Sequence, residues 1–491
     1  TFRHWRTPGV APGVAGEEGR VHQDRSDLYR ERQRLVRDAL SGRLNRRQIL
    51  QRGAALGLGA ASLSGLLGDV RRASAQTPAP SGSIVSWAPS GQRWELPQKA
   101  VYPLFQEKFP DVSIEWVAEP IADYIPRTVI EMSAKSEQFD ILQDDYNVVP
   151  QLIAMGALEP LQERLEADKA YMDDILADVP ENVMDLYRDK PAADGGILYG
   201  LPPDSNCQLQ YYRIDILEQA GIDKPADTWD DAIEIAKTLA ESGVKQTGTT
   251  LKRGLFAGGV FITIVRTFGG DWFDKMEPGA FNPALNTEAG NNAIQVLLAL
   301  KPYLEDSALN ASDDESNPAM ANGTWTYAPL QWGGTTMNDP NFTEFYEVWG
   351  TTRVPKGNVE GGDHRPHMGG LGMLVPAYSR NKDAAWEFVK FCCSGNAQDP
   401  AIGKAWVEGT GQPARASLLK EYAPLRAHFP AIQESLPTAM RYPAIPESNA
   451  LYEAIGNEVA SVMLGEKDAE AALADMDAAA RQIMQDAGYY N

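Results

Sequence analysis

The chain has 491 residues, of which 43% are hydrophobic and 23% charged, a composition that allows two or three domains with sizeable cores and excludes bulk disorder. Its net charge of −22 is uneven, because residues 1–75 hold 14 arginines, no lysine and seven acidic residues, so the rest of the chain is more acidic than the whole. Such acidity argues against nucleic acid as a partner, since it repels phosphate backbones, and it would suit a cationic ligand, although acidity more often serves solubility.

A pair of arginines precedes an apolar run near the start of the chain. Arg46 and Arg47 stand ahead of residues 53–67, which are rich in Ala, Gly and Leu and too few to cross a hydrocarbon layer of about 30 Å. Ala73 and Ala75 then form an A-x-A cleavage site. This order resembles a twin-arginine export signal. No cysteine follows the run, so we expect an exported protein, periplasmic or otherwise extracytoplasmic, without a lipid anchor.

Strand and helix patterns alternate after this leader. The expected elements of the first part are strands at 83–87, 112–117 and 140–142, and helices at 95–108, 124–134 and 149–155. Further on we expect helices at 229–241 (capped by Thr228 with Asp231), 289–301 and 383–391, a strand at 371–375, and a helical stretch at 449–487 broken near Gly465. The rhythm implies an α/β fold with a parallel sheet covered by helices. Ligands bind such sheets beyond the carboxyl ends of strands, here the loops after Trp87, Leu142 and Leu201.

The three cysteines show no metal-binding or CxxC spacing. Cys207 stands alone, and Cys392 and Cys393 are adjacent, a spacing that makes a strained bridge. We therefore expect Cys392 and Cys393 to be buried, unbridged thiols on a helix, and we predict neither a metal centre nor a cofactor.

Several segments, in order across residues 83–491, resemble the family 1 extracellular solute-binding proteins, the receptors of carbohydrate ABC importers of the maltose-binding type. The segments that carry this resemblance are 199–204 (YGLPPD), 210–215 (QYYRID), 217–222 (LEQAGI), 228–232 (TWDDA), 319–325 (AMANGTW), 368–373 (MGGLGM), 381–388 (NKDAAWEF), 411–417 (GQPARAS) and 442–446 (YPAIP). Arg213 stands where the family usually has Asn.

The resemblance implies a two-lobed periplasmic-binding-protein fold of type II, with hinge-connected lobes and a central ligand cleft. When the family's division into lobes is carried over by the order of the motifs, lobe one would comprise residues 81–207 and 357–400, and lobe two residues 208–356 and 401–491. Residues 1–75 would form an N-terminal extension and the signal. It further implies a monomeric receptor without catalysis, which captures a sugar or oligosaccharide and delivers it to the permease subunits of an ABC transporter.

Sugars present hydroxyls at their edges and C–H groups on their faces, so their receptors need carboxylates, amides and aromatic planes. Polar and aromatic residues of this kind stand in loops at Trp87, Gln92, Asp144, Asp145, Asn206, Asp271, Trp272 and Trp332. The resemblance places the family's aromatic platform at Trp325 or Tyr327 and at Tyr452, and its carboxylate at Asp144 or Asp145. Arg415 would donate bidentate bonds to an acidic sugar or to the other lobe.

For other aromatic and histidine residues we expect structural roles. Trp229 and Trp386 lie at core spacing on helices, and His364 and His367 lie with Asp363 in a Gly-rich loop, where a flexible segment is favoured over a metal site.

Two other functions compete with sugar capture. One is a receptor for a polyamine or for ferric iron, where iron would need Tyr211 and Tyr212 to face the cleft. The other is a secreted glycoside hydrolase, which needs two carboxylates about 5–10 Å apart. Asp144 and Asp145 are adjacent and hence opposed on a strand, and no G-x-S-x-G, HExxH or P-loop motif is present.

Overall fold

The computed structural model describes residues 82–490 except 91–92, 244, 276–280, 334–335, 341 and 442. Residues 81–491 make up one compact unit. The predicted signal residues Arg46, Arg47, Ala73 and Ala75 and the predicted ligand residue Gln92 lie outside the described residues.

The first sheet has five strands in the order β2-β1-β3-β9-β4. Their bounds are β1 Ser83–Pro89, β2 Ser113–Glu119, β3 Ile141–Asp145, β4 Gly200–Leu201 and β9 Leu371–Leu374. β1 pairs in parallel with β2 and β3, as the alternating pattern predicts, whereas β9 runs antiparallel to both β3 and β4. The sheet is therefore mixed, and a strand from late in the chain lies between two early ones.

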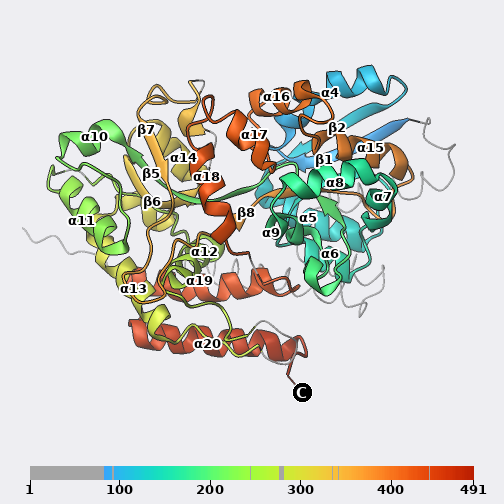
Figure 1. The fold of residues 1–491 in the computed structure, drawn as a ribbon. Helices are drawn as coiled ribbons and strands as arrows, with labels where there is room; N and C mark the ends of the chain where they lie inside the picture. The colour runs from blue at the N-terminus through green and yellow to red at the C-terminus, as the bar shows by residue number, and fades with distance from the viewer. Residues whose placement is uncertain are drawn as a thin grey trace, which may run out of the picture. The chain divides into compact units, whose positions relative to one another are not determined.

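Helices cover this sheet, and those from distant parts of the sequence lie side by side (Figure 1). The helices of the first part are α4 Glu95–Lys108, α5 Ile121–Ser133, α6 Val149–Ala154, α7 Gln162–Ala167, α8 Lys169–Asp178 and α9 Glu181–Met184. α15 (Lys382–Cys392) and α16 (Pro400–Glu408) return to pack on α4. The predicted lobe boundary at residue 400 thus falls where α16 begins, and α16 packs with the first sheet's helices.

The second sheet is built on β5, Asn206–Arg213. β6 (Tyr327–Trp332) and β7 (Trp349–Thr352) flank it, and the short β8 (Met368–Gly369) pairs with its first residues, all antiparallel. Its helices are α10 Ile214–Gln219, α11 Trp229–Ala240, α12 Leu255–Thr267, α13 Glu288–Leu300, α14 Asp313–Ala321, α18 Phe429–Ser435, α19 Ser448–Leu464 and α20 Ala469–Asp486. α17 (Ala416–Glu421) contacts α18 and, through Ser417, hydrogen-bonds to Asp178 at the end of α8. Short 3₁₀ helices lie at Asp185–Tyr187, Ala192–Asp194, Lys301–Tyr303, Asp306–Asn310, Thr336–Asn338 and Leu436–Thr438.

Two chain segments connect the sheets directly. One runs from β4 into β5, and the other from β8 into β9 through Gly370. Gly370 has a φ of 147°, and a Cβ there would lie 2.9 Å from the carbonyl oxygen of Asp204 in the neighbouring connection. Only glycine allows the two connecting segments to approach this closely.

The last two helices stack below α12 and α13 (Figure 1). The predicted break at Gly465 is confirmed, since this residue ends α19 in a left-handed conformation with a φ of 78°. Thr228 and Asp231 also form the expected capping box at the start of α11.

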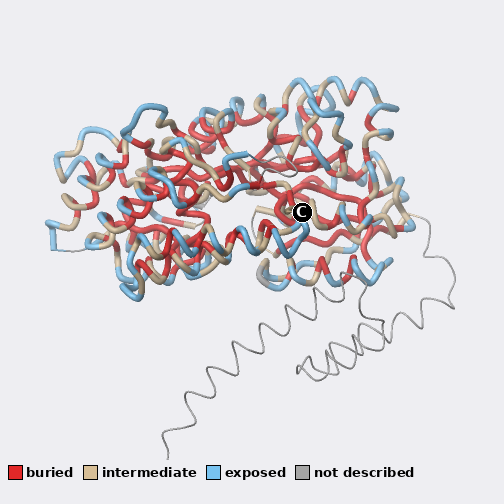
Figure 2. Tube along the Cα trace, turned by 90° about the horizontal axis from the view of Figure 1, so that it is seen from below, coloured by how far each residue is buried: buried red, intermediate tan, exposed pale blue. Residues whose placement is uncertain are grey.

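Buried residues run through both sheets and along the inner sides of their helices (Figure 2). Trp229 and Trp386 belong to this core, as their helical spacing predicts. The three cysteines are buried and unbridged, as expected for Cys392 and Cys393. Among the described residues, no helix is long and apolar enough to span a bilayer.

Candidate functional site

Polar side chains gather where the strands of the first sheet end. β3 ends at Asp144 and Asp145, the loop after β1 supplies Arg93, and the connection that leaves β4 supplies Asp204 and Ser205. Since β1, β3 and β4 all point the same way, their carboxyl ends meet at one edge of the sheet. This is the edge at which open α/β sheets bind ligands.

Arg93 lies at the centre of this edge. Its Nη2 atom lies 3.7 Å from Oδ2 of the fully buried Asp204. With its amide oxygen turned towards the guanidinium, Asn206 accepts a hydrogen bond from Arg93 Nη1 at 2.9 Å. The guanidinium also lies over the ring of Trp94, 5.8 Å from its centroid. Arg93 thus ties the loop after β1 to the strand connection that leads into β5.

The second wall of the site comes from the other sheet. Asp313 is the first residue of α14, whose capping box of Ser312 and Glu315 fixes where the helix begins. Gln331 and Trp332 end β6, whose last residue pairs with Gln208 at the start of β5. Arg93 lies close enough to Asp313 to lower the pKa of this carboxyl across the site. The site therefore has walls from both sheets.

Of the carboxyl groups of the site, Asp144 and Asp204 are fully buried, and Asp145 and Asp313 are half-buried. Burial raises the pKa of Asp144 to about 8 and that of Asp145 to about 7, in the second case with a further rise from Asp204 and a reduction from Arg93. Burial raises the pKa of Asp313 to about 6 against the lowering effect of Arg93, and it also raises the pKa of Asp204. Carboxyl groups in such surroundings bind hydroxyl or ammonium donors strongly, because water does not compete.

Many buried polar atoms of the two walls have no hydrogen-bond partner within the described part of the chain. They include Arg93 Nε, Trp94 Nε1, Gln143 Nε2, Asp144 Oδ2, Tyr187 Oη, Asp204 Oδ2, Ser205 Oγ, Asp313 Oδ1, Gln331 Oε1, Gln412 Oε1 and His428 Nε2. Each such group costs about 1–3 kcal/mol when it stays unsatisfied. So many in one region are what a binding site for a polar ligand requires.

The two walls also contact each other beside the site. Asn147, just after β3, donates from Nδ2 to Oδ1 of Asn449 on α19 at 3.1 Å. His367, which precedes β8, lies between two tyrosines, with Nε2 2.7 Å from Tyr146 Oη and Nδ1 3.1 Å from Tyr452 Oη. Burial lowers the pKa of His367 well below its ordinary value, with a further reduction from Arg266. The neutral ring thus links both sheets at their connection.

Comparison with known proteins decides the family. Residues 87–397 match the model of the bacterial extracellular solute-binding proteins. The chain belongs to this family. Proteins of this family bind solutes and are not enzymes, and membership implies that the protein is exported.

Curated relatives of this solute-binding protein cover most of its length. The mannitol-binding protein of Pseudomonas aeruginosa is 26% identical over 79% of this chain and 89% of its own. The arabinooligosaccharide-binding protein of Halalkalibacterium halodurans is 23% identical over 78% of each chain.

Solved structures of other solute-binding proteins share its fold. Maltose-bound MalE3 of T. maritima superposes with a TM-score of 0.71 at 19% identity, covering 82% of this chain and all of the other. An ABC transporter solute-binding protein from Agrobacterium vitis with bound D-mannitol gives a TM-score of 0.69 at 20% identity, covering 83% of this chain and 99% of the other. The solute-binding protein thus has the predicted two-lobed fold of type II.

Among the predicted ligand residues, the structure brings Asp144, Asp145, Asn206 and Trp332 to the site of this solute-binding protein. Trp332 is half-buried and lies 5.5 Å from the ring of His367. Trp272 and Tyr452 pack edge to face with centroids 4.5 Å apart, and Asp271 pairs with the buried Arg266 at 3.0 Å. Trp272, Tyr452 and Asp271 thus border the site on the side of α12 and α19.

Other predicted ligand residues lie away from this cluster. Trp87 is fully buried, stacks on Phe139 at 4.1 Å and donates from Nε1 to Glu119 at 2.7 Å. Trp325 and Tyr327 are fully buried within the second sheet's layer, where Tyr327 Oη donates to Gln210 at 3.3 Å. All three rings pack within a lobe.

Arg415 also lies away from the cluster, because it makes its contacts with residues of lobe one. Its Nη1 lies 2.8 Å from Asp174 Oδ2, and its Nε donates to the carbonyl of Cys393 at 2.9 Å. The segment around Arg415 is thereby anchored to α8.

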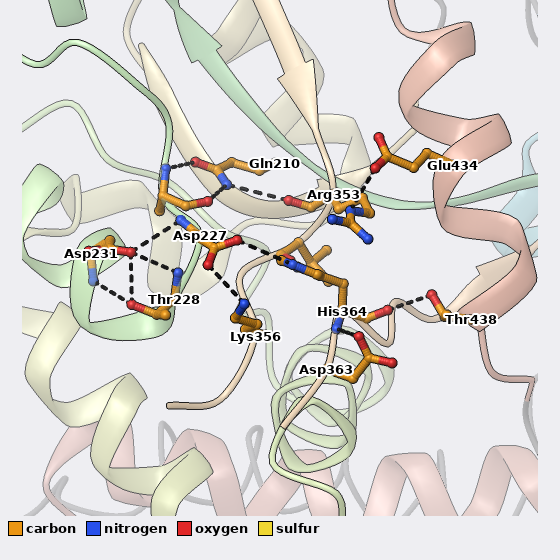
Figure 3. A network of polar contacts seen from close by, with 12 residues as sticks. Gln210, Asp227, Thr228, Asp231, Arg353, Lys356, Asp363, His364, Glu434 and Thr438 are labelled. Carbon is orange, nitrogen blue, oxygen red and sulfur yellow. Dashed lines mark hydrogen bonds and ion pairs between the residues drawn. The ribbon is translucent and has the colours of Figure 1, made fainter. Parts of the chain in front are cut away.

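The Gly-rich segment of His364 is held by a polar network next to β7 (Figure 3). His364 Nδ1 lies 2.7 Å from the carbonyl of Val354, and its Nε2 lies 3.3 Å from Asp227, which also pairs with Lys356 at 2.9 Å. Nowhere in the described residues do three or more His, Cys, Asp or Glu side chains form a metal site. The network anchors the segment that leads to His367 and β8.

Arg93, Asp204 and Asp313 are absent from the set of ligand residues predicted from the sequence. Arg93 follows the predicted Gln92 in the same loop, and Asp204 lies two residues before the predicted Asn206. Asp313 follows Ser312 in a capping-box pattern, so its helix was detectable. That this helix begins opposite Arg93 depends on the pairing of β5 with β6, which one sequence does not show.

Proposed function

We propose that this chain is the extracytoplasmic receptor of an ABC importer, which captures a sugar, polyol or oligosaccharide between its two lobes and delivers it to membrane permease subunits. The observation that carries this proposal is the set of buried polar atoms without hydrogen-bond partners on both walls around Arg93. Polyhydroxylated ligands have enough donors and acceptors to satisfy such a set. Relatives that are named for mannitol and arabinooligosaccharide binding support the same class of ligand.

The aromatic residues of the site suit this class as well. Trp332 and Trp94 offer ring faces or edges next to the polar cluster, where the C–H face of a sugar ring would pack. An iron receptor would use tyrosines at the strand ends, but Tyr211 and Tyr212 lie within β5 and pair with β6 and β7. We therefore favour a carbohydrate over ferric iron.

We further propose that the receptor is monomeric and reaches the extracytoplasmic space through the twin-arginine route, without a lipid anchor. A double substitution of Arg46 and Arg47 by lysine should leave the protein in the cytoplasm, because this route requires the arginine pair. Arg52→Lys is the matched control and should be exported. Cleavage after Ala75 would give a product that begins with Gln76. Export of the double variant at the normal rate would contradict this route.

A thermal-shift panel of the purified protein tests ligand capture. A ligand present at 1,000 times its Kd should raise the free energy of unfolding by about 4 kcal/mol. We expect such stabilisation from at least one monosaccharide, polyol or oligosaccharide. Stabilisation by polyamines alone would contradict the proposed ligand class, and turnover of a glycoside by the pure protein would contradict a receptor role.

A further inference from the structure

The carboxylates around Arg93 outnumber the cations that face them. Asp145, Asp204 and Asp313 all lie within the electrostatic reach of this single guanidinium. Two other acidic residues have a cation of their own: the half-buried Asp271 pairs with Arg266 and the buried Asp339 with Arg426, each at 3.0 Å. Three carboxyl groups therefore share one guanidinium.

The unsatisfied atoms of the site include two amide oxygens, which can only accept hydrogen bonds. Gln331 donates its Nε2 hydrogen to Ser316 Oγ at 2.7 Å, and Gln412 donates to the carbonyl of Ser205 at 2.6 Å, so each amide is left with a buried Oε1 atom that lacks a donor. Asp204 Oδ2 is a further buried acceptor without a hydrogen-bond donor among the described residues. A ligand that satisfies these three acceptors must bring hydrogen-bond donors to them.

We propose that the natural ligand is a saccharide or polyol that carries a protonated amino group, which Asp145, Asp204 and Asp313 recognise together. This inference rests on the proposed carbohydrate function and narrows its ligand class. An ammonium group brings three donors and no acceptor, whereas each hydroxyl brings one donor and two lone pairs. It also supplies the positive charge that Arg93 alone does not provide.

The imidazole of His428 does not supply this charge. His428 is fully buried, and its Nδ1 lies 3.2 Å from Oδ1 of Asn338. Burial, followed by the charges of Arg426 and Arg93, lowers the pKa of His428 to about 3. The ring is therefore neutral at pH 7. With Nδ1 protonated towards Asn338, Nε2 is another acceptor that lacks a donor.

Isothermal titration at pH 7 with matched pairs of ligands tests the inference. The pairs are D-glucosamine with D-glucose, and 1-amino-1-deoxy-D-sorbitol with D-sorbitol, and N-acetyl-D-glucosamine serves as a neutral control of similar bulk. We expect the amino member of at least one pair to bind tenfold or more tightly than its neutral partner, since charge-assisted hydrogen bonds are about twice as strong as neutral ones. Neutral members that bind as tightly as their amino partners, or more tightly, would overturn the inference and leave the carbohydrate function intact. If no carbohydrate binds, or only spermidine does, the proposed function fails and the inference with it.

Substitutions then show which carboxylates recognise the amine. Asp313→Asn and Asp145→Asn should each reduce the ratio of amino to neutral affinity by about tenfold, because each replaces a carboxyl group by a neutral amide. Asp314→Asn is the matched control, because Asp314 is exposed in the same first turn of α14, and it should leave the ratio unchanged. A ratio that is unchanged in both site variants would contradict the inference.

Discussion

Arg93 Nη2 and Asp204 Oδ2 lie 3.7 Å apart, although the two residues come from different connections of the first sheet. Arg93 follows β1, whereas Asp204 leads from β4 into β5, the strand on which the second sheet is built. The pair thus sits where the ligand site and the connection between the lobes meet. A ligand that binds here contacts the segment about which the lobes would move.

The carboxyl of Asp145 should make the stability of the ligand-free protein depend on pH. Because burial raises the pKa of Asp145 to about 7, the folded protein keeps a proton that the unfolded chain releases from about pH 4. The stability linked to this proton is fully present at low pH and is lost as the pH rises from about 4 to 7. Asp145→Asn cannot ionise. The variant should match the wild type near pH 4 and exceed its free energy of unfolding by on the order of 1 kcal/mol at pH 8, after screening by solvent.

Urea unfolding of both proteins at pH 4, 6 and 8 measures this difference. Asp314→Asn, an exposed carboxyl, should run parallel to the wild type at all three values. A difference between Asp145→Asn and wild type that stays constant across the range would show that Asp145 is ionised throughout.

Arg415 provides a test between the sequence-based prediction and the structure. The structure pairs it with Asp174 and Asp178 in a nearly closed environment. Arg415→Met should therefore lower the free energy of unfolding by about 1–3 kcal/mol, because the half-buried Asp174 and Asp178 lose their charged hydrogen-bond partner, and it should leave the Kd of the ligand unchanged. Loss of ligand affinity without loss of stability would instead support the ligand-binding role predicted from the sequence.

The hydrogen bond between Asn147 and Asn449 should favour the arrangement in which the two walls are in contact. It joins the end of β3 to α19 at 3.1 Å, across the two lobes. Asn449→Ala should weaken ligand binding by about 2- to 10-fold, as expected from the loss of one neutral hydrogen bond, with most of the change in the dissociation rate. Stopped-flow measurement of dissociation provides the check. A ligand that leaves the variant at the wild-type rate would show that this contact does not contribute to closure.

The sequence predicted the local structure well where periodicity and capping determine it. The helix expected at 95–108 is α4 with the same bounds, and the capping box of Thr228 and Asp231 is present. These features depend on neighbours within four residues, which a single sequence contains.

The side chains that line the site were predicted less completely. Trp87 was expected at a strand end, but β1 continues to Pro89, which leaves this ring inside the sheet against Phe139. Asp313 reaches the site only because β6 pairs with β5 and thereby positions α14 opposite Arg93. Such pairings between distant segments are set by the tertiary fold, so loop composition alone did not predict which polar residues line the site.

The most direct test of the account compares the wild-type receptor with Arg93→Met by titration with the carbohydrate that stabilises the wild type. Loss of the guanidinium removes charge-assisted hydrogen bonds at the centre of the site, so Kd should rise by about 10- to 100-fold. Lys99→Met, which removes an exposed cation paired with Glu95 on α4, should bind like the wild type. If Arg93→Met binds the same carbohydrate with unchanged affinity, the ligand site lies elsewhere and the account is wrong.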